Sequence, residues 1–259
     1  SDNFFKYFSV KGYSQYAKVD DNMDRTLTSR TEERKYYLKN DSAGGEIEFK
    51  SNLNDNHQLT YGVDYSEADI SRLRTTISST TGTSTAKDTP DTNIKRTGIY
   101  LQDEFSIDKF DFIAGLRYDN YELDAKTDSI VTNTNYANDF SADNVSPKFA
   151  ATFNFNDNIS GYASYSKGFR APTYYEFNGN FSSSTRRYRV VSNPNLKAET
   201  SDGYEVGLRG DTTKAKFKIS AFLNKYNNFI QQFVGATNTS GGAFNGYTDY
   251  KSINVDKAE

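Results

Sequence analysis

Apolar and polar residues alternate along most of this chain. In the stretch HQLTYGVDYS, Leu59, Tyr61 and Val63 fall on one face of an extended strand, and the polar residues between them fall on the other. The same period of two recurs in four further stretches: 110–119, 145–155, 203–209 and 216–224. An alternation of this kind predicts β-strands with one apolar and one polar face, and no stretch shows a helical stripe.

The connections between these strands are of two kinds. Short turns are expected at 53–57, 107–109, 156–158 and 211–214. Long polar loops are expected at roughly 20–29, 72–93, 124–143, 168–198 and 232–249. Short turns at one end and long loops at the other are typical of outer-membrane β-barrels. We therefore predict an all-β, antiparallel transmembrane barrel wall of about ten strands.

In such a barrel, the apolar strand faces meet lipid and the polar faces meet a wet interior. The residues expected to face lipid are Leu59, Tyr61, Val63, Phe149, Phe153, Phe217 and Ile219. The residues expected to face the interior include Arg117, Lys148, Glu205 and Lys216. A soluble sandwich or propeller also alternates, but it gives no reason for the asymmetry of turns and loops.

Composition agrees with amphipathic strands. The mean hydropathy is −0.80, yet the chain has 20 tyrosines, 19 phenylalanines and only four prolines. A disordered chain of this polarity would be poor in aromatic residues. The net charge of −3 argues against nucleic acid as a partner, and the lack of cysteine excludes disulfides and thiolate metal sites. No apolar run approaches the length of a membrane-spanning helix.

Two short motifs bracket the loop at 168–198. They are FRAP, which is Phe169, Arg170, Ala171 and Pro172, and NPNL, which is Asn193, Pro194, Asn195 and Leu196. With the fragments GIYLQDEF, IAGLRYDNYEL, NVSPKFAATF and YASYSKGFRAP, the chain resembles TonB-dependent outer-membrane receptors, in particular the haem and haemoglobin branch. The resemblance is clear over roughly residues 94–231 and looser elsewhere.

The resemblance implies a place in the outer membrane of a Gram-negative bacterium and a barrel of about 22 strands filled by a plug domain. Residues 1–259 are then expected to be part of that barrel, roughly its seventh to sixteenth strands, without the plug. We expect these strands not to close into a barrel by themselves. The implied partners are membrane lipid, the TonB complex acting through the plug, and a haem-carrier protein.

The motif residues have a structural interpretation. Pro172 and Pro194 lack the N–H that a strand ladder needs, so they end pairing at the two ends of the loop. Asn193 and Asn195 can satisfy backbone groups in a turn. Arg170 could pin the base of the loop to a carboxylate such as Glu199.

The loop between the motifs is the predicted binding segment, and its candidate ligand-binding residues are Tyr174, Tyr175, Arg186, Arg187 and Tyr188. Haem-binding members of the family place a histidine in this loop, but here the sole histidine, His57, lies in a short turn. Tyrosinate can ligate haem iron, and guanidinium groups suit a propionate or a siderophore carboxylate. The nature of any metal ligand stays open.

The expected function is TonB-dependent uptake of an iron-containing ligand, either haem or a haem-carrier protein. Haem or a ferric chelate is expected as cargo and not as a permanent cofactor. Alternatives are a receptor for a ferric siderophore or another metal chelate, and a passive pore or adhesin. The loops show no nucleophile–base pair and no histidine, so we do not expect an enzyme.

Overall fold

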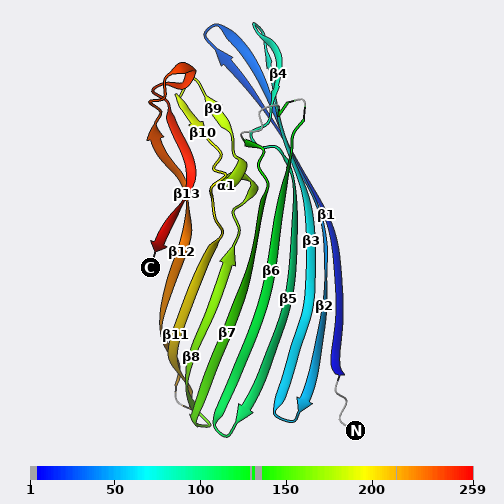
Figure 1. Ribbon diagram of the computed structural model, residues 1–259, viewed down its shortest axis with the longest axis vertical. Helices are drawn as coiled ribbons and strands as arrows, with labels where there is room; N and C mark the ends of the chain where they lie inside the picture. Colours follow the sequence, from blue (N-terminus) through cyan, green and yellow to red (C-terminus); the bar gives the residue numbers. More distant parts are fainter. Residues whose placement is uncertain (1–4, 129, 132–135, 214, 259) are drawn as a thin grey trace.

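The computed structural model describes residues 5–128, 130–131, 136–213 and 215–258. It confirms the all-β prediction (Figure 1). The ten long strands are β1 (Phe5–Leu27), β2 (Arg30–Asn54), β3 (His57–Ser78), β5 (Asp91–Ile107), β6 (Phe110–Lys126), β7 (Phe140–Asn156), β8 (Ile159–Arg170), β11 (Glu199–Asp211), β12 (Lys216–Thr237) and β13 (Thr248–Ala258). The shorter elements are β4 (Gly82–Ala86), α1 (Tyr174–Asn178), β9 (Phe181–Ser183), β10 (Tyr188–Val190) and the 3-10 turn η2 (Gly242–Phe244). Neither helical element of the described residues is long and apolar enough to cross a membrane.

The long strands pair in chain order, each antiparallel to the next, from β1 through β8 and then β11 to β13. In addition, β4 pairs with β3, and β10 lies parallel to β13 at the far end of the sheet. Among the described residues β1 pairs only with β2, and no ladder joins it to β13. The described strands therefore form an open sheet.

Figure 1 shows the tight turns after β2, β5 and β7 at one end of the sheet, which we call the short-turn end. The opposite, long-loop end differs from the prediction. At 20–29 there is no loop, because β1 and β2 continue as a hairpin with a tight turn between Leu27 and Arg30. Likewise β3 runs into the predicted loop at 72–93, and β12 into that at 232–249. The predicted loop 124–143 and turn 211–214 lie partly outside the described residues.

The strand register places the apolar residues on one face of the sheet. One row of paired residues on that face contains Val10, Ile47, Val63, Ile99, Tyr118 and Val145. All seven residues predicted to face lipid lie on this face, which we call the apolar face. Ile219 is 67% exposed and Phe149 46%. Large apolar side chains that are exposed on a continuous sheet face need a non-aqueous neighbour.

Aromatic rings gather on the apolar face near the short-turn end. Phe105 stacks on Phe112 with ring centres 5.1 Å apart, Phe112 lies 5.6 Å from Phe110, and Phe110 lies 4.8 Å from Phe153. A girdle of aromatic residues beside the tight turns is the pattern that membrane barrels show at the interface of the bilayer.

The opposite, polar face carries an ordered network of charges. Arg117 donates to both oxygens of Asp64, at 2.8 and 3.0 Å, and to Asp119 at 2.7 Å. Tyr100 donates to Glu46 and Glu48 at 2.9 and 3.0 Å. The other residues predicted to face the interior, Lys148, Glu205 and Lys216, share this face by register.

Pro147 lies within β7, opposite Leu116, and not at the start of the strand. The ladder between β7 and β8 begins one residue further on, at Lys148. Proline is tolerated at such a position, where the strand is paired on one side only.

The segment from 171 to 198, which we call the strap, contains α1, β9 and β10 and joins β8 to β11. It folds onto the polar face at the long-loop end, beside β12 and β13 (Figure 1). Beneath it lies the main apolar cluster of Ile94, Tyr121 and Leu123. The strap is therefore packed into the sheet and is not a free loop.

Candidate functional site

The strap begins with a tight local structure. Ladder pairing of β8 ends at Arg170, and Pro172 follows with its side chain fully buried. Thr173 then caps α1: its hydroxyl accepts from the Glu176 amide at 3.2 Å, and its own amide donates to the Glu176 carboxylate at 2.8 Å. This reciprocal capping box fixes the direction in which the chain leaves the sheet.

Phe169 and Ala171 of the FRAP motif pack against the apolar cluster under the strap. Tyr121 of that cluster also donates its hydroxyl to the Pro172 carbonyl at 3.2 Å. The motif thus joins the strap to the sheet through both apolar and polar contacts.

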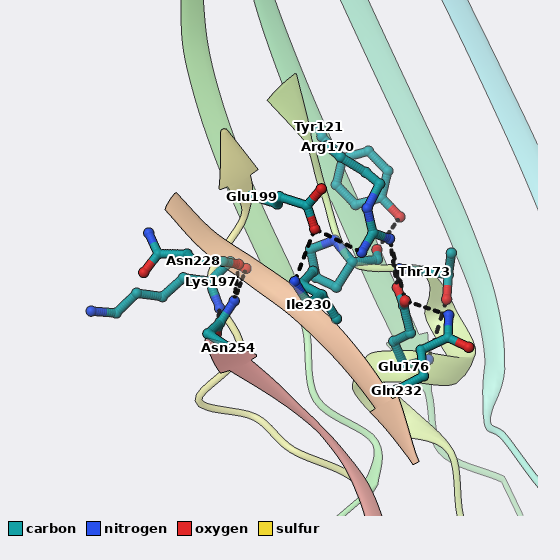
Figure 2. A network of polar contacts seen from close by, with 11 residues as sticks. Tyr121, Arg170, Thr173, Glu176, Lys197, Glu199, Asn228, Ile230, Gln232 and Asn254 are labelled. Atoms are coloured by element: carbon teal, nitrogen blue, oxygen red, sulfur yellow. Dashed lines mark hydrogen bonds and ion pairs between the residues drawn. The ribbon is translucent and has the colours of Figure 1, made fainter. Parts of the chain in front are cut away.

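Arg170 lies between two buried carboxylates (Figure 2). It donates to Glu176 at 3.0 and 3.2 Å and to Glu199 at 3.1 Å, so the predicted pairing with Glu199 is present. The same carboxylates accept from β12: Gln232 donates to Glu176 at 2.7 Å, and the Ile230 amide donates to Glu199 at 2.9 Å. We call Arg170, Glu176 and Glu199 the carboxylate clamp. It ties β8, the strap, β11 and β12 together.

The charge of Glu176 is stabilised despite its burial. Burial opposes ionisation, but hydrogen bonds from the Thr173 amide, Gln232 and Arg170 outweigh it and lower the pKa of the carboxyl group. Glu176 is therefore ionised at neutral pH.

The NPNL motif anchors the other end of the strap. Asn193 donates its side-chain amide to the Ser252 carbonyl at 2.8 Å, and its side-chain oxygen accepts from the Asn195 amide at 3.2 Å. Pro194 and Asn195 are exposed at the turn.

Leu196 is buried in a second apolar cluster with Phe177 and Ile230. Just beyond it, the Lys197 amide donates to the side-chain oxygen of Asn254 at 2.8 Å, and the Asn254 side chain donates back to the Lys197 carbonyl at 3.0 Å (Figure 2). Both ends of the strap are thus fixed to the wall formed by β12 and β13.

Of the five predicted ligand-binding residues, Tyr175 and Tyr188 lie together. They line one depression of about 440 Å³ at the long-loop end, which we call the aromatic pocket. Its lining residues are Asp88, Tyr175, Phe181, Tyr188, Val190, Phe233 and Tyr250. The Tyr188 ring lies between two others: it is tilted against Phe181, with ring centres 5.7 Å apart, and edge-on to Tyr250 at 5.9 Å.

The other three candidates lie elsewhere. Tyr174 packs against the apolar cluster under the strap. Arg186 is in the exposed turn between β9 and β10. Arg187 donates to the Asn245 carbonyl at 3.1 Å and lies over the Tyr247 ring at 5.3 Å, so it links the strap to the loop before β13.

Sequence reasoning missed Asp88, Phe233 and Tyr250, because each belongs to a segment distant from the motifs. Burial raises the pKa of Asp88 against the opposing charges of Arg74 and Arg72. Phe233 adopts a positive φ of 54° at an irregularity in β12. No local pattern in the sequence signals that these residues meet the strap.

Tyr175 is poorly suited to act as an anion. Burial raises the pKa of its phenol, and the nearby charge of Asp88 adds to the effect. Within the described part of the chain, no group of three or more His, Asp or Glu side chains could hold a metal ion. His57 lies at the short-turn end, where its Nδ1 is 2.7 Å from Asp103 and its ring stacks on Phe105. The residues that line the aromatic pocket therefore include no histidine.

Comparison with known proteins gives the same architecture. The sequence matches the family described as TonB dependent receptor-like, beta-barrel, over residues 1–259. It is 33% identical over 130 residues to the hemoglobin-haptoglobin utilization protein B of Neisseria meningitidis serogroup C, covering 48% of this chain and 16% of that protein. It is 29% identical over 245 residues to the hemin receptor of Yersinia enterocolitica, covering 85% of this chain and 33% of that protein.

Among solved structures, the copper transporter OprC superposes with a TM-score of 0.71 at 15% identity, covering 96% of this chain and 38% of that one. This likeness concerns the fold. The chain spans about a third or less of the length of the two curated relatives. The paired strands, the apolar outer face and the match along the whole sequence lead to one conclusion: the chain belongs to the TonB-dependent receptor β-barrel family.

Proposed function

We propose that this chain is part of the wall and ligand-capturing surface of an outer-membrane receptor that takes up haem, either free or from a haem-carrier protein. The apolar face contacts lipid, the short-turn end faces the periplasm and the long-loop end faces outward. Transport uses energy supplied by TonB through a plug domain, as in the rest of the family. The receptor is a transporter and not an enzyme.

One observation carries the proposal. The strap holds an aromatic pocket at the long-loop end, and two anchors fix that pocket to the wall: the carboxylate clamp and the Asn193–Ser252 contact. Aromatic side chains on a rigid support suit a large planar ligand, because they supply contact area at little cost in conformational entropy. The similarity to a hemoglobin-haptoglobin utilization protein and to a hemin receptor supports haem as the ligand.

A second candidate is a ferric siderophore or another metal chelate. The strap sequence has no histidine, and a chelate brings its own iron ligands. Such a ligand would need only the aromatic and cationic contacts of the long-loop end.

Uptake measurements with the whole receptor separate these candidates. Tyr174, Tyr175, Arg186 and Arg187 are replaced with alanine, together and singly, and uptake of haem, a haem carrier and a ferric siderophore is measured separately. We expect loss of haem uptake, with Tyr175→Ala the most damaging single change because Tyr175 lines the pocket. Selective loss of siderophore uptake would favour the second candidate. Unchanged uptake of all three would reject the strap as a binding element.

A further inference from the structure

Two arginines of β3 reach toward the strap from the facing part of the sheet. Arg72 and Arg74 are two residues apart in one strand, so both lie on the polar face. The Arg72 guanidinium is 5.4 Å from the ring centre of Tyr175, and the Arg74 guanidinium is 5.0 Å from that of Phe181. Both rings belong to the aromatic pocket.

These arginines differ from three other arginines of the chain. Arg117, Arg170 and Arg189 each donate hydrogen bonds to carboxylates. In the described residues Arg72 has no hydrogen bond or ion pair, and Arg74 has one ion pair, with Asp88 at 3.4 Å. Arg72 is half-buried, so its five N–H donors are held near the pocket without a protein acceptor.

Two depressions adjoin the arginines. One is the aromatic pocket, whose Tyr175 and Phe181 rings contact them, and the other is a depression of about 370 Å³ that is lined in part by Tyr36, Met23, Arg72 and Arg74. Asp88 borders both depressions. A ligand placed among the strap rings would therefore bring its edge groups to the guanidinium groups.

We propose that Arg72 and Arg74 bind the carboxylates of a planar, conjugated ligand whose ring packs against Tyr175, Phe181 and Tyr188. Guanidinium forks match carboxylates in a bidentate geometry, and the rings beneath them hold the forks in a fixed plane. This inference rests on the proposed function, since haem is a planar ligand with two carboxylates, and it assigns the carboxylate contacts to residues of β3.

The test compares two ligands on the whole receptor in detergent or nanodiscs. Hemin and its dimethyl ester share the same ring, but the ester has no carboxylate charge. Binding of each is titrated by absorbance for the unchanged receptor and for Arg72→Gln, Arg74→Gln and the control Arg30→Gln. Arg30 is an exposed residue at the β1–β2 turn, paired with Glu32, and does not line the aromatic pocket.

We expect Arg72→Gln to weaken hemin binding by about tenfold or more, with Arg74→Gln in the same direction. The ester should bind the unchanged receptor about as weakly as hemin binds the Arg72 variant. The ester should bind the Arg72 variant and the unchanged receptor equally well, because the ester has no carboxylate for Arg72 to bind. Arg30→Gln should have no effect.

Two outcomes would overturn the inference while leaving the proposed function intact. One is hemin affinity that Arg72→Gln and Arg74→Gln leave unchanged. The other is equal weakening of hemin and ester, which would show that Arg72 acts only by supporting Tyr175. The comparison of the two ligands on the unchanged receptor does not depend on the folding of any variant: equal affinity for both also rejects carboxylate recognition. If the unchanged receptor binds no hemin, the proposed function fails and this inference fails with it.

Discussion

Removal of the guanidinium of Arg170 should release the strap. In Arg170→Met the aliphatic stem is kept, but Glu176 and Glu199 lose the cation between them. Both carboxylates are nearly buried, at 4% and 8% exposure, so their charge cannot be solvated in place. Breaking a buried ion pair by removing one partner costs about 3–5 kcal/mol.

The expected effect is smaller than that range, because the Arg170 side chain is 40% exposed and water can partly replace it. Gln232 and the Ile230 amide also keep their bonds to the carboxylates. We therefore expect about 2–3 kcal/mol. This loss should act on opening of the strap and not on unfolding of the sheet, because Arg170 and Glu199 are only the terminal pair of the β8–β11 ladder.

Hydrogen exchange followed by mass spectrometry measures this opening directly. Amides that the strap protects, such as those of Phe177, Gly179 and Asn193, should exchange about 30–150-fold faster in Arg170→Met. Peptides from β5 and β6 should not change. Arg186→Met removes the same charge from the exposed turn of the strap and should leave exchange unaltered. Equal protection in Arg170→Met and the unchanged protein would refute the role of the clamp.

Three further predictions concern the sheet and the long-loop end. Ile219→Lys on the apolar face should destabilise the membrane-inserted protein by up to about 2–4 kcal/mol, whereas Ser220→Lys on the polar face should be tolerated. Heat-modified mobility on gels measures the stability of both variants, and equal effects would contradict the assignment of faces. Gly98→Ala should disturb the polar network, because a Cβ there would lie 2.0 Å from the Arg117 guanidinium, whereas Gly12→Ala should be tolerated, because the nearest atom to its Cβ would be 3.9 Å away. Thermal melting in detergent compares the two variants, and equal melting temperatures would contradict the prediction. The hydrogen bond from Lys87 lowers the pKa of Asp128 below its ordinary 3.8, so the folded state gains stability above that pH and loses it as the pH falls through the lowered value. Hydrogen exchange of the Val131 amide, which donates to Asp128 at 2.7 Å, should therefore accelerate only below about pH 4 after correction for intrinsic rates, and Asp128→Asn should abolish that pH dependence.

The sequence predicted the strands well where the membrane imposes a pattern. Lipid requires every second residue to be apolar, so the alternation around Val63 and Phe149 shows in the sequence. Beyond the lipid no such requirement exists. The hairpin formed by the end of β1 after residue 19 and the start of β2 therefore has polar residues on both faces, and its sequence resembles that of a loop.

For the same reason, part of the candidate site could not be predicted from the sequence. Arg72 and Arg74 fall in a stretch that was predicted to be a polar loop, although β3 runs through it. The pairing of Arg170 with Glu199 was predictable, because the two motifs place these residues at the ends of adjoining strands, where they face each other. Glu176 could also have been found: Thr173 and Glu176 have the spacing of a capping box. The contacts of Asp88 and Tyr250 with the strap depend on the tertiary fold alone.

The most direct test of the account is uptake of iron-labelled haem by cells that produce the whole receptor, with and without TonB. We predict TonB-dependent uptake that falls to the background level when Tyr175 and Tyr188 are both replaced with alanine, with the amount of receptor in the outer membrane unchanged. Uptake that does not depend on TonB, or that persists in the double variant, would contradict it.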